Sequence, residues 1–453
     1  MKYWSPQAWV QGEWLTHVLL EADETGHWSD IRPHTPAHSV EQAIRLGLVL
    51  PGLVNAHSHA FQRAMAGMAE RRHGAAPGDD FWGWRERMYQ VALRISPEQL
   101  EDVAVFLYQE MLQCGFTHVC EFHYLHRDTQ GHAYADPTEM SWALVRAAQR
   151  TGIGLTLLPT LYMHSGLGAT ALTQAQRRFA STPDTVLALQ QTLAKHIDQQ
   201  QLTTLMHAGA AIHSLRAVDG GAMRELAQAL PTQPLHIHAA EQSREVQDCL
   251  THLGQRPVEW LLEHVGLDKR WHLIHATHSL PHELQGLAQA GASVVVCPST
   301  EANLGDGVWD MPNAMQQGLT WSIGTDSHVN RAWTTELLGL EYSQRLLHQQ
   351  RNVAASASVH PSSAAVLFEC ALNGGSAASG LPLGGICKGQ RADFQSFDTR
   401  HHALLGIPAM HLLDALVFSS PHALPSQVGV AGRLITPLDS ASAWTRTMQA
   451  LWI

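Results

Sequence analysis

The sequence has few charged residues and lacks both Lys/Arg blocks and long apolar runs. Only 15% of its 453 residues are Asp, Glu, Lys or Arg, and the formal net charge is −11. An acidic chain of this kind argues against nucleic acid and anionic membranes as partners. No apolar run approaches the length of a membrane span, and MKYWSPQAWVQGEW lacks the apolar core of a signal peptide. We therefore expect a globular, cytoplasmic protein without a membrane partner.

The cysteines are also few, and their spacing excludes two common uses. The chain has no CxxC pair and no pattern typical of a disulfide framework. The six residues are Cys114, Cys120, Cys249, Cys297, Cys370 and Cys387. Scattered cysteines are typical of small buried side chains in a reducing compartment, which agrees with a cytoplasmic location.

The order of predicted elements divides the chain into two β-rich ends and a long α/β middle. Strand candidates in the tail include ALVFSS and VGVAGRLI. In the middle, apolar runs such as GIGLTLLPTLY and ASVVVCP alternate with helical stretches that end on glycine, such as MSWALVRAAQRTG. This alternation predicts βαβ units around a parallel sheet. We predict an α/β barrel over residues 52–375 and a small β domain built from residues 1–51 and 376–453.

Polar residues follow several predicted barrel strands, at the end where α/β barrels carry their chemistry. His57 and His59 follow the first apolar run, and residues two apart on a strand point to the same side. Because the chain has 30 histidines, this pair alone is a weak signal. Later strand ends supply His238, Glu241, His275 and Asp326. Imidazole and carboxylate ligands can share a metal, and a nearby carboxylate can move a proton.

Each of these residues has an ordinary alternative interpretation when it is taken alone. A histidine pair can be a polar strand end, and Asp326 in TDSH can be a helix N-cap. His236 lies deeper in its predicted strand, and we interpret it as an interior histidine held by a hydrogen bond. The whole series of strand ends is much more specific than any one member.

The order of the motifs resembles the amidohydrolase superfamily, specifically its deaminase-like branch. The resemblance implies a (β/α)8 TIM barrel with a small β-sandwich domain built from both termini. It implies that one divalent metal is held by His57, His59, His238 and Asp326. Glu241 and His275 would handle protons, and Asp326 would also act as a base. The ligands suit zinc, while Fe²⁺ and Mn²⁺ stay open. Members with two metals bridge them with a lysine of the fourth strand, and LTLLPTLY, taken as that strand, has none.

A closer resemblance is carried by HSHAFQRAM, HSLRAV and TEANLGDG. Together they resemble the amidohydrolases that convert N-formimino-L-glutamate to N-formyl-L-glutamate and ammonia in histidine degradation. The resemblance implies a homodimer and a small dicarboxylate amidine as the substrate. It implies that the substrate is bound by Gln62, Arg85, Tyr124, His213 and Arg216. The residue types agree, because the planar guanidinium of arginine can bind a carboxylate through two hydrogen bonds.

Several alternatives stay open at this point. A related deaminase acting on a ring such as guanine or cytosine would need stacking aromatics and no carboxylate clamps. A non-catalytic scaffold would need neither the metal ligands nor the proton-handling pair, and a formimino-arginine-like or hydantoin-like substrate is a third possibility. Arg85 can also be interpreted as part of a solvated helix face over Trp82 and Trp84, and Tyr124 as a buried phenol.

Overall fold

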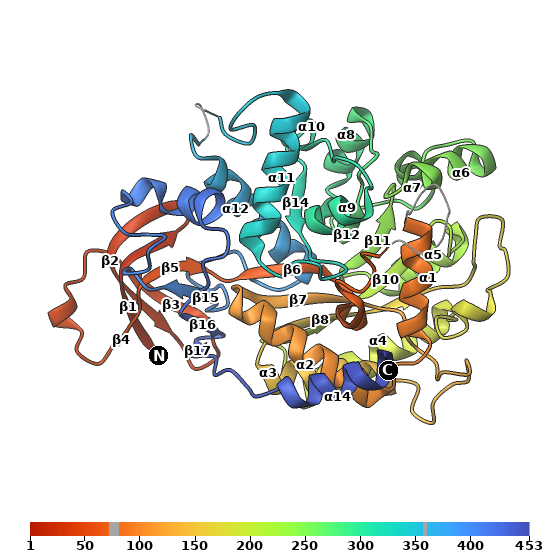
Figure 1. Cartoon of the computed structure of the whole chain (residues 1–453), viewed down its shortest axis with the longest axis horizontal. Coiled ribbons are helices and arrows are strands. Elements are labelled where there is room, and N and C mark those ends of the chain that lie inside the picture. The colour runs from red at the N-terminus through yellow and green to blue at the C-terminus, as the bar shows by residue number, and fades with distance from the viewer. Residues whose placement is uncertain (72–80, 357–359, 453) are drawn as a thin grey trace.

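Two β-sheets organise the residues that this computed structural model describes, 1–71, 81–356 and 360–452 (Figure 1). The larger sheet is a barrel of parallel strands in the order β14-β13-β12-β11-β10-β8-β7-β6, with β9 (Met206–Ala208) beside β8. Its strands are β6 (Leu53–Ser58), β7 (Phe116–His123), β8 (Gly154–Leu161), β10 (Ala210–Ser214), β11 (Leu235–Ala239), β12 (Trp271–His275), β13 (Ser293–Val296) and β14 (Thr320–Ile323). The predicted α/β barrel is confirmed.

The first and last barrel strands meet at their carboxyl ends. Ser58 forms a parallel bridge with Asp326, and the Asp326 amide donates to the His57 carbonyl at 3.0 Å. Gly324 allows this approach, because a Cβ there would lie 2.7 Å from the Cβ of His57. Asp326 itself has a φ of 45°, in the left-handed region that a residue with a side chain seldom adopts. The backbone that closes the barrel therefore also carries predicted metal ligands.

The two ends of the chain form the second sheet, as predicted. Its order is β17-β16-β15-β5-β1-β2-β3, with β4 paired to β1. The strands are β1 (Lys2–Val10), β2 (Glu13–Ala22), β3 (Trp28–Arg32), β4 (Ile44–Arg45), β5 (Leu48–Pro51), β15 (Phe394–Phe397), β16 (Gln427–Val430) and β17 (Arg433–Leu434). Antiparallel pairing of β15 with β5 joins the tail to the beginning of the chain. This sheet lies to the left of the barrel in Figure 1.

The apolar run GLVLPGLV is shared between the two sheets. β5 ends at Pro51 and β6 begins at Leu53. Between them, Gly52 lies so close to Thr117 that a Cβ would be 2.3 Å from that side chain. The run therefore forms two strands, because only a residue without a side chain fits at the crossing.

Helices surround the barrel, and several begin or end at residues typical of helix caps. They are α1 (Phe81–Ala92), α2 (Pro97–Gln113), α3 (Glu139–Thr151), α4 (Pro183–Gln199), α5 (Gly220–Ala229), α6 (Ser243–Leu253), α7 (Pro257–His264), α8 (Pro281–Ala290), α9 (Pro298–Leu304), α10 (Met311–Gln316), α11 (Trp333–His348) and α12 (Ser363–Ser379). Helix α2 begins at a capping box between Ser96 and Gln99, and α3 ends at Gly152 with a φ of 78°. None of the helices in the described ranges combines the length and apolar character that a membrane span requires.

The tail contains helices where strands were expected. The prediction of a strand at ALVFSS is wrong, because residues Ala415–Ser419 form a helical turn that continues directly from α13 (Leu412–Asp414). Phe418 stacks on Tyr342 of α11 with ring centroids 6.0 Å apart, so packing against a helix overrides the β propensity of the segment. The last helix, α14 (Ala441–Trp452), packs on α2 of the barrel, where Trp444 stacks on Phe106 with centroids 4.4 Å apart (Figure 1).

One barrel strand was missed. Strand β10 lies fourth in the barrel, between β8 and β11. The prediction that LTLLPTLY is the fourth strand is therefore wrong, since that segment lies in β8, the third strand. Strand β10 has only five residues, AAIHS, and two of them are alanines of low β propensity. It also lacks lysine, so a bridging lysine is absent from the true fourth strand as well.

Candidate metal centre and adjoining pocket

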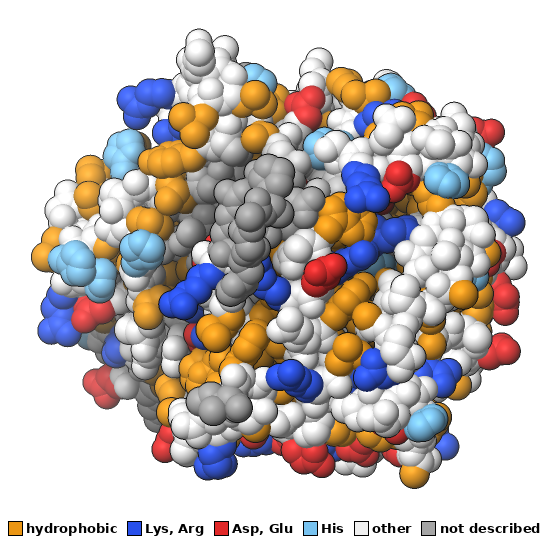
Figure 2. Space-filling view, turned by 45° about the vertical axis from the view of Figure 1, so that its right-hand side comes forward, with side chains coloured by type: hydrophobic (Ala, Val, Ile, Leu, Met, Phe, Trp, Pro, Cys, Tyr) orange, Lys and Arg blue, Asp and Glu red, His pale blue; other side chains and the backbone are white. Residues whose placement is uncertain are grey.

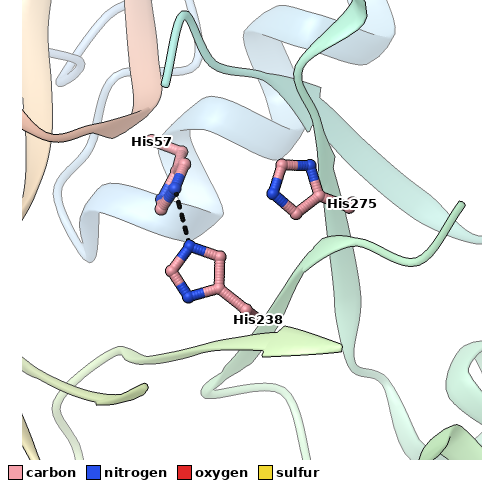
Figure 3. A group of neighbouring side chains, drawn as sticks. All are labelled: His57, His238 and His275. Atoms are coloured by element: carbon pink, nitrogen blue, oxygen red, sulfur yellow. Dashed lines mark hydrogen bonds between the residues drawn. The ribbon is translucent and has the colours of Figure 1, made fainter. Parts of the chain in front are cut away.

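Four histidine rings converge at the carboxyl end of the barrel. Figure 3 shows His57, His238 and His275 facing one another from β6, β11 and β12. The Nε2 atoms of His57 and His238 are 3.1 Å apart. The Nε2 atoms of His57 and His59 each lie 3.3 Å from Asp326 Oδ1. The predicted metal ligands are thus brought together. His57 belongs to two groups of three residues, one with His238 and His275 and one with His59 and Asp326. Within each group the ligand atoms lie within 4.8 Å of one another.

Hydrogen bonds and burial prepare these imidazoles to act as neutral ligands. Nδ1 of His59 lies 2.9 Å from the Phe122 carbonyl, and Nδ1 of His238 lies 2.9 Å from the His213 carbonyl. A carbonyl only accepts, so each Nδ1 carries the proton and each Nε2 lone pair faces the centre. Burial, and then the neighbouring histidines, lower the pKa of His57 and His238 well below the usual value. Such a buried set of nitrogen donors with one carboxylate fits a divalent metal.

His275 is surrounded by carboxylates. Its Nδ1 lies 3.1 Å from Glu301 Oε1, and its Nε2 lies 3.7 Å from Glu241 Oε1 and 3.9 Å from Asp326 Oδ2. Burial lowers the pKa of His275, but Glu241, the hydrogen bond to Glu301 and Asp326 outweigh this effect and raise it to about 10. Burial raises the pKa of Glu241 to about 7, although His275 opposes this shift. The Glu241–His275 pair can therefore hold or release a proton near neutral pH.

Glu301 is a member of this centre that sequence reasoning missed. Its Oε1 accepts the Cys297 amide at 2.8 Å while it contacts His275, so it fixes the His275 ring. Glu301 belongs to the quoted motif TEANLGDG, but nothing in the local spacing links it to His275. Only the neighbouring positions of β12 and β13 in the barrel bring the two side chains together.

One pocket joins the metal centre to all five predicted substrate-binding residues. Its polar lining includes His59, Gln62, Arg85, Tyr124, His213, Arg216, His238, Glu241, His275 and Asp326. Gln62 is placed by the 3-10 helix η2 (Ala60–Met65) directly after His59, and Arg85 by α1. Aromatic side chains, including Trp84, Tyr89 and Tyr162, complete the walls. The lining thus combines candidate metal ligands, two guanidinium groups and apolar side chains.

Several residues of this pocket carry buried polar atoms without a hydrogen-bond partner in the described part of the chain. These atoms are Gln62 Oε1, Arg85 Nε, Arg216 Nε and Glu245 Oε1. A buried polar atom left unpaired costs about 1–3 kcal/mol, so several in one pocket indicate a ligand that supplies the partners. Burial lowers the pKa of Arg85, and the neighbouring Arg216 adds to this effect while Tyr89 opposes it.

The remaining sequence predictions can also be placed. Gln62 Nε2 donates to the Tyr124 hydroxyl at 3.3 Å, and the ring of His213 packs on Tyr162 with centroids 4.4 Å apart. His236 Nε2 bonds the Ala378 carbonyl at 2.9 Å, which confirms its interpretation as an interior histidine. The cysteines are free, as expected from their spacing.

Comparisons with known proteins give consistent results. The family model described as "Amidohydrolase family" matches residues 48–435. A formimidoylglutamate deiminase from Pseudomonas aeruginosa is 44% identical over 425 residues, which cover 93% of this chain and 91% of the relative. The crystal structure of an amidohydrolase from Brucella melitensis, 40% identical, superposes with a TM-score of 0.94 over 100% of both chains. An adenosine deaminase from Xanthomonas campestris with bound zinc shares the fold at 20% identity, with a TM-score of 0.79 over 99% of this chain and 97% of that one.

Proposed function

This chain belongs to the amidohydrolase family, and we propose that it hydrolyses N-formimino-L-glutamate to N-formyl-L-glutamate and ammonia, a step of histidine degradation. The observation that carries the proposal is the position of Arg85 and Arg216 in the same pocket as the metal centre. A substrate with two carboxylates supplies the acceptors that their buried Nε atoms lack. The identity of 44% to the Pseudomonas aeruginosa deiminase supports the same reaction.

The pocket residues divide between the two parts of this substrate. Arg85 and Arg216 bind the carboxylates, for which a planar guanidinium is suited. Gln62, Tyr124 and His213 lie nearer the metal centre, where they orient the formimino group. His59 supports this placement, since its ring packs on Tyr124 with centroids 5.1 Å apart. The aromatic walls exclude water from the reacting carbon.

One divalent metal would be held by His57, His59, His238 and Asp326. When bound, it would supply the Lewis acidity that makes water a nucleophile near neutral pH. The nitrogen-rich ligand set suits zinc, and Fe²⁺ and Mn²⁺ accept the same ligand types. The absence of lysine from β10 supports a single metal.

The side chains of this pocket provide the proton transfers. Asp326 Oδ2 accepts a proton from the attacking water as its oxygen adds to the formimino carbon. Glu241 Oε1 and His275 Nε2, 3.7 Å apart, then deliver a proton to the leaving nitrogen. As the C–N bond breaks, the hydroxyl of the tetrahedral adduct loses its remaining proton to Glu241, the carbonyl of the formyl group forms, and ammonia departs. Glu301 keeps the His275 ring in position throughout.

Ammonia release from N-formimino-L-glutamate, with metal content measured on the same sample, tests this proposal. We expect turnover that follows the metal content. Metal-loaded protein that releases ammonia from guanine or cytosine instead would establish the ring-deaminase alternative. Protein without stoichiometric metal would support the non-catalytic scaffold. Formimino-arginine and hydantoin complete the substrate panel and separate the third alternative.

We also propose that the enzyme is a cytoplasmic homodimer. Resemblance to the family supports the dimer, and the free, scattered cysteines support a reducing compartment. Light scattering of the purified protein measures the assembly state, and a monomer at micromolar concentration would contradict this part of the proposal.

A further inference from the structure

A second chamber lies beside the substrate pocket and shares three of its residues. Arg85, Arg216 and Glu245 line both cavities. The outer chamber adds Trp82, Leu167 and Arg244 to this lining, whereas Arg244 does not line the inner pocket. Lys and Arg side chains lie among hydrophobic ones in the middle of the face shown in Figure 2. The inner pocket thus continues into a chamber that carries another cationic side chain.

Three guanidinium groups gather around the indole of Trp82. The Cζ atoms of Arg85, Arg244 and Arg216 lie 4.3, 4.8 and 5.7 Å from its ring centroid. Among the described residues, only Arg244 of the three has a carboxylate within 4.0 Å. That carboxylate is Asp248, and both side chains of the pair are largely exposed. Glu245 also lines both cavities and interacts electrostatically with Arg216, so two carboxylates face three guanidinium groups and the exposed Asp248 pair is weak. The arrangement therefore favours an incoming anion.

The amino-terminal end of α6 is an unfavourable place for a cation, and the exposed pair with Asp248 in the same helix offsets this only weakly. Helix α6 begins at Ser243, so Arg244 lies in its first turn. The macrodipole disfavours positive charge at this end of a helix. The charge of Arg244 is thus disfavoured by the helix terminus and by the two neighbouring arginines and only partly offset by Asp248, while its guanidinium lines the outer chamber.

We propose that Arg244 is a specificity-determining residue that attracts the dianionic substrate into the outer chamber and contacts one of its carboxylates there. The carboxylates then pass to Arg85 and Arg216 while the formimino group reaches the metal centre. This inference rests on the proposed function. Arg244 touches no reacting atom, so it acts on binding and not on the chemical step. The product, N-formyl-L-glutamate, has the same two carboxylates and uses the same route.

Arg244→Gln tests the proposal, with Arg400→Gln as the matched control. Arg400 is exposed on the loop after β15 and pairs with Asp398, so its substitution removes the same charge far from the pocket. At about 0.02 M ionic strength we expect Arg244→Gln to raise KM for N-formimino-L-glutamate by about 3- to 10-fold with kcat unchanged. At about 0.5 M salt the difference should nearly vanish, because the screening length falls to a few ångströms. Arg244→Lys should restore most of the loss.

Calorimetric binding of N-formyl-L-glutamate provides a readout that does not depend on turnover. We expect its Kd to rise with Arg244→Gln as KM does, and to stay unchanged with Arg400→Gln. Equal KM and Kd for wild type and Arg244→Gln at low salt would overturn the inference, as would a fall in kcat alone or an equal effect of Arg400→Gln. If the wild type binds the product but releases no ammonia, the proposed function fails, and the binding comparison still decides the role of Arg244.

Discussion

Arginines at the two ends of the barrel differ in how their buried hydrogen-bonding atoms are satisfied. At the amino-terminal end, Arg391 donates to Asp393 through Nη2 at 2.6 Å and Nε at 2.9 Å, and its Nη1 donates to the Thr204 carbonyl at 3.1 Å. At the carboxyl end, Arg85 and Arg216 keep buried Nε atoms without partners in the described ranges. The satisfied arginine joins the tail to the barrel. The unpaired Nε atoms of the second pair agree with the proposed binding of the substrate carboxylates.

Removing the satisfied arginine should give the largest effect. Arg391→Ala leaves Asp393 as an unpaired buried carboxylate, so we expect the free energy of unfolding to fall by about 3–5 kcal/mol. The folded fraction should keep its kcat/KM, because Arg391 is remote from the pocket. Urea denaturation followed by ammonia assays of the folded protein checks both parts. Arg400→Ala, at an exposed position, serves as control. An unchanged unfolding curve for Arg391→Ala would contradict the structural role of Arg391.

Removing an unsatisfied arginine should give the opposite pattern. Arg216→Ala should leave the free energy of unfolding unchanged or slightly higher, because it relieves the repulsion of Arg85. It should lower kcat/KM for N-formimino-L-glutamate by about 10²-fold, mainly through KM, since a buried charge-assisted contact is lost. Steady-state kinetics and urea denaturation of the same variant measure both quantities. Unchanged KM together with a large loss of stability would place Arg216 with Arg391 as a structural residue.

A smaller effect is expected from Glu301, which supports the site without facing the substrate pocket. Glu301→Gln retains an oxygen that can accept the Cys297 amide but removes the charge beside His275. We expect kcat to fall about 10-fold with metal content unchanged, as for other groups that orient an active-site imidazole. Kinetics combined with metal analysis distinguishes this role from metal binding. Loss of the metal itself would show that Glu301 supports the ligands instead.

The sequence was informative about polar residues that lie at the carboxyl ends of the barrel strands. His57, His238, His275 and Asp326 could be found because motif order and strand order coincide. The five predicted substrate-binding residues followed from family resemblance, and the pocket that they share could not be derived from spacing. ALVFSS was predicted wrongly because its conformation depends on packing against α11, which lies far away in the sequence.

Residues that act through tertiary proximity could not be predicted. Glu301 reaches His275 only through adjacent strands, and Arg244 reaches Trp82 only because α6 and α1 line the same chamber. Strand β10 was too short to give a periodic signal, and packing between β8 and β11 defines it. The difference between Arg391 and the pair Arg85 and Arg216 depends on which N–H groups have hydrogen-bond partners. Those partners are brought together only when the chain folds.

The central claim is that the cationic pocket beside the metal centre selects an amidine with two carboxylates. The most direct test compares kcat/KM for ammonia release from N-formimino-L-glutamate and from N-formiminoglycine, which has one carboxylate, using protein of known metal content. The account predicts a preference of about 10- to 100-fold for N-formimino-L-glutamate, because the second carboxylate forms a charge-assisted hydrogen bond. Equal kcat/KM for the two compounds, or no ammonia from either by metal-loaded protein, would contradict it.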